Sequence, residues 1–152
     1  MWSALNVTVP PGKLSMECPT YICNPEKVTD ALGCWPSFHD AEVISFSATR
    51  AAPGQAGKTS ARLCVNVCQY KEVGGGTADY EIVCCKNVLI EMLFTDLQFL
   101  SLEDFNHQNV INSIKFSRLE NPLIEVEIES IYGVGGVIRC MNVEISDVTL
   151  LL

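Results

Sequence analysis

The two histidines of this chain are the residues best suited to acid–base or metal chemistry, and each lies in a short polar segment beside an expected strand. His39 is followed directly by Asp40, and His107 lies within Asn106–Asn109. Imidazole and carboxylate groups can together bind a metal ion or transfer a proton. If the fold brings the two segments together, His39, Asp40 and His107 form one cleft for a small molecule or a metal ion, with hydrolysis as the chemistry that such a cleft could perform.

The same segments have a simpler structural interpretation, which we favour. Side chains such as His39 and Asp40 commonly hydrogen-bond the backbone where a strand begins. Asparagine tolerates left-handed backbone and its amide can replace a turn hydrogen bond, so Asn106 and Asn109 could build the connection between two strands. The functional alternative is a recognition loop in which Asn106–Asn109 presents amide and imidazole groups, because loops often carry binding residues.

Eight cysteines offer candidate nucleophiles and metal ligands, but their spacing matches no known site. Cys64 and Cys68 share a strand face with backbones about 13 Å apart at ~3.3 Å per residue, too far to hold one zinc ion. A catalytic thiol needs a base beside it, and no spacing here joins a cysteine to a histidine. The chain lacks the motifs of serine hydrolases, zinc peptidases and nucleotide-binding proteins, so we expect no enzyme activity, no metal and no cofactor. The cysteines interpreted as small buried hydrophobes are Cys64, Cys68, Cys84 and Cys85.

Length and composition indicate one ordered domain over 1–152, with 1–23 as an irregular N-terminal arm. Of the 152 residues, 48% are hydrophobic and 18% are charged, which is a globular composition in a chain large enough to fold without disulfides. The first residues lack the features of a signal peptide, and no apolar run reaches the ~20 residues that span a bilayer. We therefore expect a soluble cytoplasmic protein that does not bind membranes and has reduced thiols.

The acidic excess lies entirely in the second half of the chain. The net charge is −8. Residues 1–76 contain six basic and six acidic residues, whereas residues 77–152 contain four basic and twelve acidic ones. Because nucleic-acid-binding proteins need clustered lysine and arginine, this class is excluded. An acidic surface can instead attract a basic protein partner, although such charge also simply keeps proteins soluble.

The elements that must position these residues are mostly strands. Asn24 as a cap, Pro25 at the first helical position and Gly33 past the end predict one short N-terminal helix. Short connections between alternating apolar segments favour antiparallel neighbours. We predict a mainly β (α+β) domain with an antiparallel sheet of six or more strands, either a sandwich or one strongly curved sheet. The predicted strands are an edge strand at Leu5–Val9, Ala41–Thr49 with Ile44, Phe46 and Ala48 on one face, Ala61–Glu72, Tyr80–Cys85 and Val88–Phe94 as one long or two short strands, Val110–Leu119, and a hairpin from Ile124 to Leu150.

The C-terminal hairpin is the most specific local prediction. Apolar residues alternate with glutamates over 124–129, and the turn falls within Gly133–Gly136. A two-residue and a four-residue loop give the same register, which sets Glu125 opposite Glu144. The outer face is then a solvated acidic surface. The predicted pairs are Tyr132 with Val137, Ile128 with Met141 and Val126 with Val143, and the acidic face comprises Glu125, Glu127, Glu129 and Glu144.

Several strings in the sequence resemble bacterial proteins of the immunity protein 50 type. They are Asn24-Pro25-Glu26, Trp35–Val43, Leu102–Val110 and Tyr132-Gly133, and they occur in order over roughly 24–148. The arm at 1–23 and the loop at 51–60 have no counterpart. The resemblance implies a cytoplasmic protein that binds and blocks a cognate toxin domain and has no catalytic residues.

The sequence therefore favours a non-catalytic binding protein whose acidic second half meets a basic toxin. Pairing with a second copy through an unpaired strand edge is a further interpretation. The candidate partner-binding residues lie in the two histidine segments and on the acidic face, and they are His39, Asp40, Asn106, His107, Gln108, Asn109, Glu125, Glu127, Glu129 and Glu144.

Overall fold

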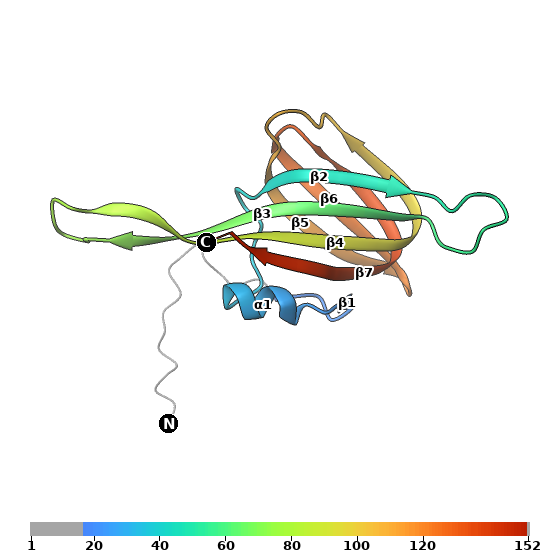
Figure 1. Cartoon of the computed structure of the whole chain (residues 1–152), viewed down its shortest axis with the longest axis horizontal. Coiled ribbons are helices and arrows are strands. Elements are labelled where there is room, and N and C mark those ends of the chain that lie inside the picture. The colour runs from blue at the N-terminus through green and yellow to red at the C-terminus, as the bar shows by residue number, and fades with distance from the viewer. Residues whose placement is uncertain (1–16, 152) are drawn as a thin grey trace, which may run out of the picture.

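One strongly curved sheet of seven strands makes up most of the computed structural model, which describes residues 17–151 (Figure 1). Neighbouring strands follow the order β1-β7-β4-β3-β2-β5-β6, and β6 also pairs with β7, so the strand order closes on itself. Only the β1–β7 pairing is parallel among those described. The mainly β prediction is confirmed, and of the two architectures left open the protein has the curved sheet. The elements are β1 (Ile22–Cys23), α1 (Glu26–Leu32), β2 (Glu42–Thr49), β3 (Ser60–Val73), β4 (Glu81–Glu103), β5 (Val110–Glu120), β6 (Leu123–Tyr132) and β7 (Gly135–Leu150).

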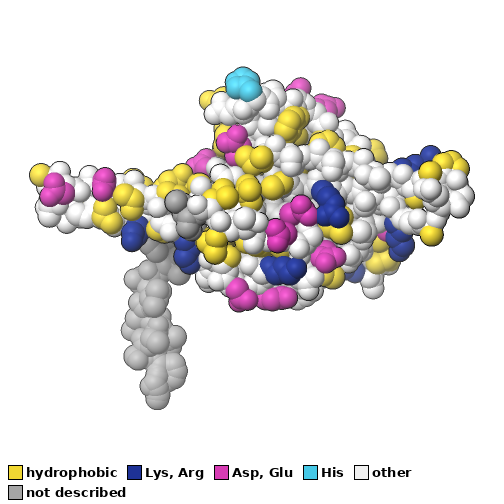
Figure 2. All heavy atoms as spheres, viewed as in Figure 1, with side chains coloured by type: hydrophobic (Ala, Val, Ile, Leu, Met, Phe, Trp, Pro, Cys, Tyr) yellow, Lys and Arg dark blue, Asp and Glu magenta, His cyan; other side chains and the backbone are white. Residues whose placement is uncertain are grey.

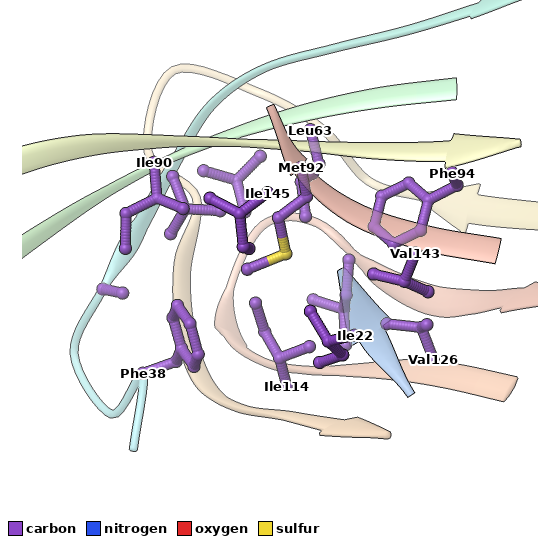
Figure 3. Close-up of a cluster of buried hydrophobic side chains, with 14 of the residues drawn as sticks. Ile22, Phe38, Leu63, Ile90, Met92, Phe94, Ile114, Val126, Val143 and Ile145 are labelled. Atoms are coloured by element: carbon purple, nitrogen blue, oxygen red, sulfur yellow. The ribbon is translucent and has the colours of Figure 1, made fainter. Parts of the chain in front are cut away.

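Alternate residues of the long strands fill the interior of this sheet. The sequence predicts that Leu63 and Val65 share one face of β3, and that Ile90, Met92 and Phe94 share one face of β4. This alternation is confirmed, because all five residues are fully buried. They converge with side chains from β5, β6 and β7 in one cluster, which Phe38 also joins (Figure 3). Burial of each such side chain stabilises the fold by about 1.5–3 kcal/mol. The side chains of the inner face are therefore buried in the core, and a binding partner can reach only the outer face and the connections between strands.

The helix α1 ends as predicted but does not begin as predicted. Gly33 has φ 82° and its N–H donates to the Thr29 carbonyl at 2.8 Å, which closes the helix. Pro25 occupies the N-cap position with no side-chain cap, so the prediction of Asn24 as the cap is wrong. Asn24 has φ 58°, and its Nδ2 donates to Glu144 Oε1 on β7 at 3.2 Å, which ties the helix to the sheet instead. Within residues 17–151, no helix has the length and apolar character needed to cross a membrane.

The N-terminal arm is only partly as predicted. Ile22 and Cys23 form β1 and pair with Val143 and Glu144 of β7, so the end of the segment expected to be irregular is a short strand. Ile22 is buried in the core, which explains why this part is ordered. The predicted strand at Leu5–Val9 lies outside the described residues.

A bulge in β2 changes which of its residues face inward. Val43 pairs with Val65 and Ser45 pairs with Cys64, so Ile44 has no residue opposite it. Val43 is buried, whereas Ile44 is 47% exposed. The prediction that Ile44 shares the apolar face is wrong because the extra residue shifts the alternation by one position.

The segments Tyr80–Cys85 and Val88–Phe94 belong to a single strand, since β4 runs unbroken for 23 residues. After Val67 on β3 and before Val88 on β4, the two strands pair only with each other. Residues 69–86 therefore form a two-stranded ribbon, here called the β3–β4 ribbon, that projects from the body of the sheet (Figure 1). Two strands without further support are marginally stable in water.

The register predicted for the C-terminal hairpin is wrong. Val126 pairs with Ile138 instead of Val143, because β6 continues to Tyr132, which pairs with Val110 of β5 and not with Val137. The observed register still sets apolar residues opposite one another. Buried residues alternate along β7 at Ile138 and Cys140 and again at Val143 and Ile145, but the two series are one residue out of step. The apolar residues of β6 can therefore be set opposite either series, and the apolar pattern fits two registers equally well. The remaining observed pairs are Ile124 with Cys140, Glu125 with Arg139, Glu127 with Val137 and Ile128 with Gly136.

Candidate functional site

The connection between β4 and β5 is built around the side-chain amide of Asn109. This residue is 3% exposed, and its Oδ1 accepts hydrogen bonds from the N–H groups of Asn106 at 2.9 Å and Val134 at 3.2 Å. Its Nδ2 donates to the Asn106 carbonyl at 2.7 Å. Asn109 therefore joins the β4–β5 connection to the turn between β6 and β7, and its burial removes it from the surface that a partner could touch.

The other polar residues of this connection are exposed. The Oδ1 of Asn106 accepts a hydrogen bond from the Gln108 N–H at 3.0 Å, and Asn106 Nδ2 donates to the Asp104 carbonyl at 2.9 Å. These bonds form a compact turn in which Asp104 takes a left-handed conformation, with φ 63°. His107 and Gln108 point outward from this turn as exposed side chains. The segment is thus a shaped turn that presents two polar groups.

His39 and Asp40 form an exposed corner in front of β2. Phe38 and Asp40 have φ 63° and 64°, and the buried Phe38 ring fixes the corner to the core. His39 Nδ1 lies 3.0 Å from Asn112 Oδ1 on β5, and His39 Nε2 lies 3.6 Å from Asp40 Oδ2. The second contact is an ion pair when the imidazole is protonated. His39 Nδ1 also lies 3.4 Å from the Asn112 carbonyl, so the predicted backbone contact is seen for His39, whereas the described contact of the Asp40 side chain is with His39.

The two histidine segments do not combine into a metal site. Across residues 17–151, no three His, Cys, Asp or Glu side chains lie close enough to hold one ion. The strands bring the segments near each other, since the Val43 N–H donates to the Asn109 carbonyl at 2.9 Å. Even so, His39, Asp40 and His107 do not form the ligand set required by the metal-binding alternative, and that alternative is wrong in this form.

The predicted acidic face is divided and largely paired with cations. Glu125 accepts a hydrogen bond from Arg139 Nε at 2.9 Å, so Arg139 occupies the place predicted for Glu144. Lys115 Nζ lies 3.3 Å from Glu129 and 3.9 Å from Glu127. Its hydrogen bond and its charge lower the pKa of the Glu129 carboxyl.

Glu144 lies apart from the other three glutamates. It pairs with Cys23 of β1 and Leu93 of β4, on a part of β7 that β6 does not reach. A mixture of charges is also visible over β3, β4 and β7, where acidic and basic side chains lie next to one another (Figure 2). The expectation of one bare acidic sheet face is therefore wrong.

A hollow of ≈ 620 Å³, here called the β4–β7 hollow, opens on the outer face where the end of β4 meets the start of β7. Alternate residues of β4 line it, while Leu100 and Leu102 between them pack against the core. Gly133, Gly135 and Gly136, between β6 and β7 and at the start of β7, also line it. The side chains that line it include Phe99, Ser101, Glu103, Asp104, Val137 and Arg139.

Sequence reasoning missed this hollow because it depends on pairing between segments far apart in the chain. Ser101 pairs with Val137, and Phe99 pairs with Arg139. The one available signal was the glycine-rich run Gly133–Gly136, which we interpreted only as a turn. Three glycines at one strand entrance leave a surface without side chains, and such a surface is a place for close approach of a ligand or another backbone.

The cysteines contribute no catalytic arrangement to this surface. All eight are free thiols, and none of their described hydrogen bonds involves a histidine. Burial raises the pKa of the Cys140 thiol to about 11, so this group stays protonated at neutral pH. The interpretation of the other strand cysteines as buried is wrong for Cys85, which is exposed, and incomplete for Cys64, Cys68 and Cys84, which are half-buried.

Comparison with known proteins gives one informative match. Comparison with curated proteins and with solved structures finds no match. A protein-family model, described as immunity protein 50, matches residues 24–151. The match covers α1 and every strand from β2 to β7, including the β4–β5 turn and the β4–β7 hollow. The chain therefore belongs to the immunity protein 50 family.

Proposed function

We propose that this protein neutralises a basic toxin domain by direct protein–protein contact in the cytoplasm and performs no chemistry itself. Membership of the immunity protein 50 family is the observation that carries the proposal. The acidic excess of the second half of the chain agrees with a basic partner, because opposite net charges accelerate encounter.

The proposed contact surface joins the exposed members of the candidate set. His107 and Gln108 lie on the β4–β5 turn, and this turn is hydrogen-bonded through Asn109 to the turn between β6 and β7. Glu127 and Glu129 lie on β6, which leads into that second turn. We place the toxin against this end of β6 and the two turns. Asp40 and His39 lie at the adjoining corner, since Asp40 N–H donates to the Ile111 carbonyl of β5.

A direct binding measurement tests the proposal. The protein encoded immediately upstream of this chain, purified as an inactivated variant, is immobilised and the immunity protein is passed over it at low salt. We expect saturable binding, and we expect the immunity protein to protect cells that express the active toxin. Absence of binding at low salt would overturn the proposal.

Charge reversal on β6 tests the surface. Changing Glu125, Glu127 and Glu129 together to lysine should slow association with a basic toxin, because charges at the rim of an interface act mainly on the association rate. Reversal of Glu72 and Glu81, two exposed acids of the β3–β4 ribbon, is the matched control. An unchanged association rate for the β6 variant would remove this face from the interface.

A further inference from the structure

Two glycines that line the β4–β7 hollow lie where another part of the backbone comes too close for a side chain. A Cβ atom on Gly136 would lie 1.9 Å from the Ser101 carbonyl oxygen, and one on Gly133 would lie 2.4 Å from the Gln108 carbonyl oxygen. Both residues also have positive φ, of 147° and 78°. The fold therefore requires glycine at both positions, and neither residue contributes a side chain to the recess of ≈ 620 Å³.

The lip of the hollow carries free negative charge. Glu103 and Asp104 are both exposed, and neither takes part in any ion pair described within residues 17–151. The one cation in the lining, Arg139, is already engaged, because its Nε donates to Glu125 at 2.9 Å and its guanidinium lies 5.2 Å from the Phe99 ring centroid. The hollow thus offers two carboxylates that take part in no described ion pair, while its own cation already has a carboxylate partner.

One exposed aromatic residue lines the hollow, and two more are next to lining residues in the chain. Phe99, within the lining, is 47% exposed. Phe105 and Tyr132 directly adjoin lining residues in the chain and are 49% and 62% exposed. Exposed aromatic rings next to a recess are typical of the central residues of protein–protein interfaces. A surface with carboxylates beside aromatic rings favours a planar cation, which can contact both kinds of group.

Resting on the proposed function, we propose that the β4–β7 hollow receives an arginine side chain from a protruding segment of the toxin. A guanidinium can stack on an aromatic ring while it donates two parallel hydrogen bonds to a carboxylate, which the ammonium of lysine cannot do. The recess lies within the range of about 300–1,000 Å³ seen for ligand pockets, so it accommodates the arginine together with part of its loop. An anionic ligand would be repelled by Glu103 and Asp104.

Two kinds of variant test this site against the toxin domain encoded upstream. Ser101→Phe fills the hollow from β4, and the double change Glu103→Gln with Asp104→Asn removes the charge while keeping side-chain size; asparagine also tolerates the left-handed backbone at 104. We expect each to weaken toxin binding by about tenfold or more, mainly through faster dissociation, since anchor residues act on dissociation. The matched controls Ser47→Phe on β2 and Glu81→Gln on the β3–β4 ribbon, both at exposed positions, should bind like the wild type.

On the toxin side, each exposed arginine is changed to alanine and to lysine. At one arginine, both the alanine and the lysine substitution should weaken binding of the toxin to the wild-type immunity protein. The same substitutions should cause little additional loss of affinity when the immunity protein already carries Glu103→Gln and Asp104→Asn. Circular dichroism and the thermal midpoint of each immunity variant establish folding, and the charge variant keeps the test valid if Ser101→Phe does not fold. If the wild type binds and the folded variants bind equally well, the hollow is not the site although the proposed function stands. If the wild type does not bind, the proposed function fails and this inference fails with it.

Discussion

The buried side chain of Asn109 satisfies three backbone groups. Its amide accepts from two N–H groups and donates to one carbonyl, and these groups belong to the β4–β5 connection and to the turn between β6 and β7. A buried backbone group that loses its partner costs about 1–3 kcal/mol, so one side chain accounts for a large share of the stability of this end of the molecule. The proposed toxin contacts at His107 and Gln108 depend on it for their position.

Asn109→Ala should lower the free energy of unfolding by about 3 kcal/mol, because it leaves these groups unpaired. Urea denaturation followed by circular dichroism measures the loss. Gln108→Ala, one residue away and exposed, is the control and should change stability by less than about 0.5 kcal/mol. Equal stability of the two variants would contradict the central role of Asn109.

The contact between Lys115 and Glu129 predicts a pH effect with a definite sign. Because Lys115 lowers the pKa of Glu129 in the folded protein, the contribution of this carboxyl to stability is present above its unfolded pKa. It is lost as the pH falls through the lower, folded pKa. In Lys115→Gln the pKa of Glu129 should rise toward its ordinary value, as measured by NMR titration of the side-chain carboxyl. A Glu129 pKa that did not move would refute the assignment.

Among the elements, the β3–β4 ribbon differs from the rest of the sheet in its support. Residues 88–95 of β4 lie between β3 and β7, whereas residues 69–86 have one neighbouring strand. Segments with few buried contacts open at lower free energy than the core. Tyr70, Tyr80 and Ile82 are exposed here, so little apolar burial opposes local opening.

Amide hydrogen exchange should therefore divide β4 into two parts. The N–H groups of residues 81–86 should exchange much faster than those of residues 88–94, although both parts belong to one strand. NMR-detected exchange at neutral pH resolves them. Uniform protection along the whole of β4 would show that the ribbon has support from elsewhere, such as a second copy of the chain.

The sequence predictions are accurate for features that depend on neighbouring residues and fail for features that depend on distant segments of the chain. The alternation in β3 and β4 and the stop at Gly33 depend on neighbouring residues, and these predictions are confirmed. The bulge at Ile44 and the pairing of Val126 with Ile138 depend on the partner strand, which the sequence does not specify when an apolar pattern fits two registers. The β4–β7 hollow is even harder to predict from the sequence, because it requires β4 to pair with β7 and Gly136 to contact Ser101. The role of Asn106 and Asn109 in building the β4–β5 turn follows from residue chemistry alone and is confirmed, whereas a binding role of this turn stays a prediction.

For the molecule as a whole, β7 is the element that makes the sheet one unit. It pairs with β4 along almost its entire length, with β6 on its other edge over Gly136–Cys140, and with β1 further along that edge. Chain segments from both ends of the described sequence therefore meet on one strand. A sheet closed in this way cannot lose one strand and keep the pairing of its neighbours intact.

Unfolding should consequently be a single cooperative transition, as is usual for domains of this size. Trp35 is buried beside Phe38 and Phe116, so its fluorescence reports on packing while far-UV circular dichroism reports on the sheet. With Trp2 changed to phenylalanine, Trp35 is the only tryptophan, and the two urea transitions should coincide. Removal of residues 135–152 should abolish the transition in both signals, because β4 and β6 would each lose a partner and the core would lose Ile138, Val143 and Ile145. Two separate transitions in the full chain, or a folded truncated chain, would show that the sheet is made of parts that are stable independently.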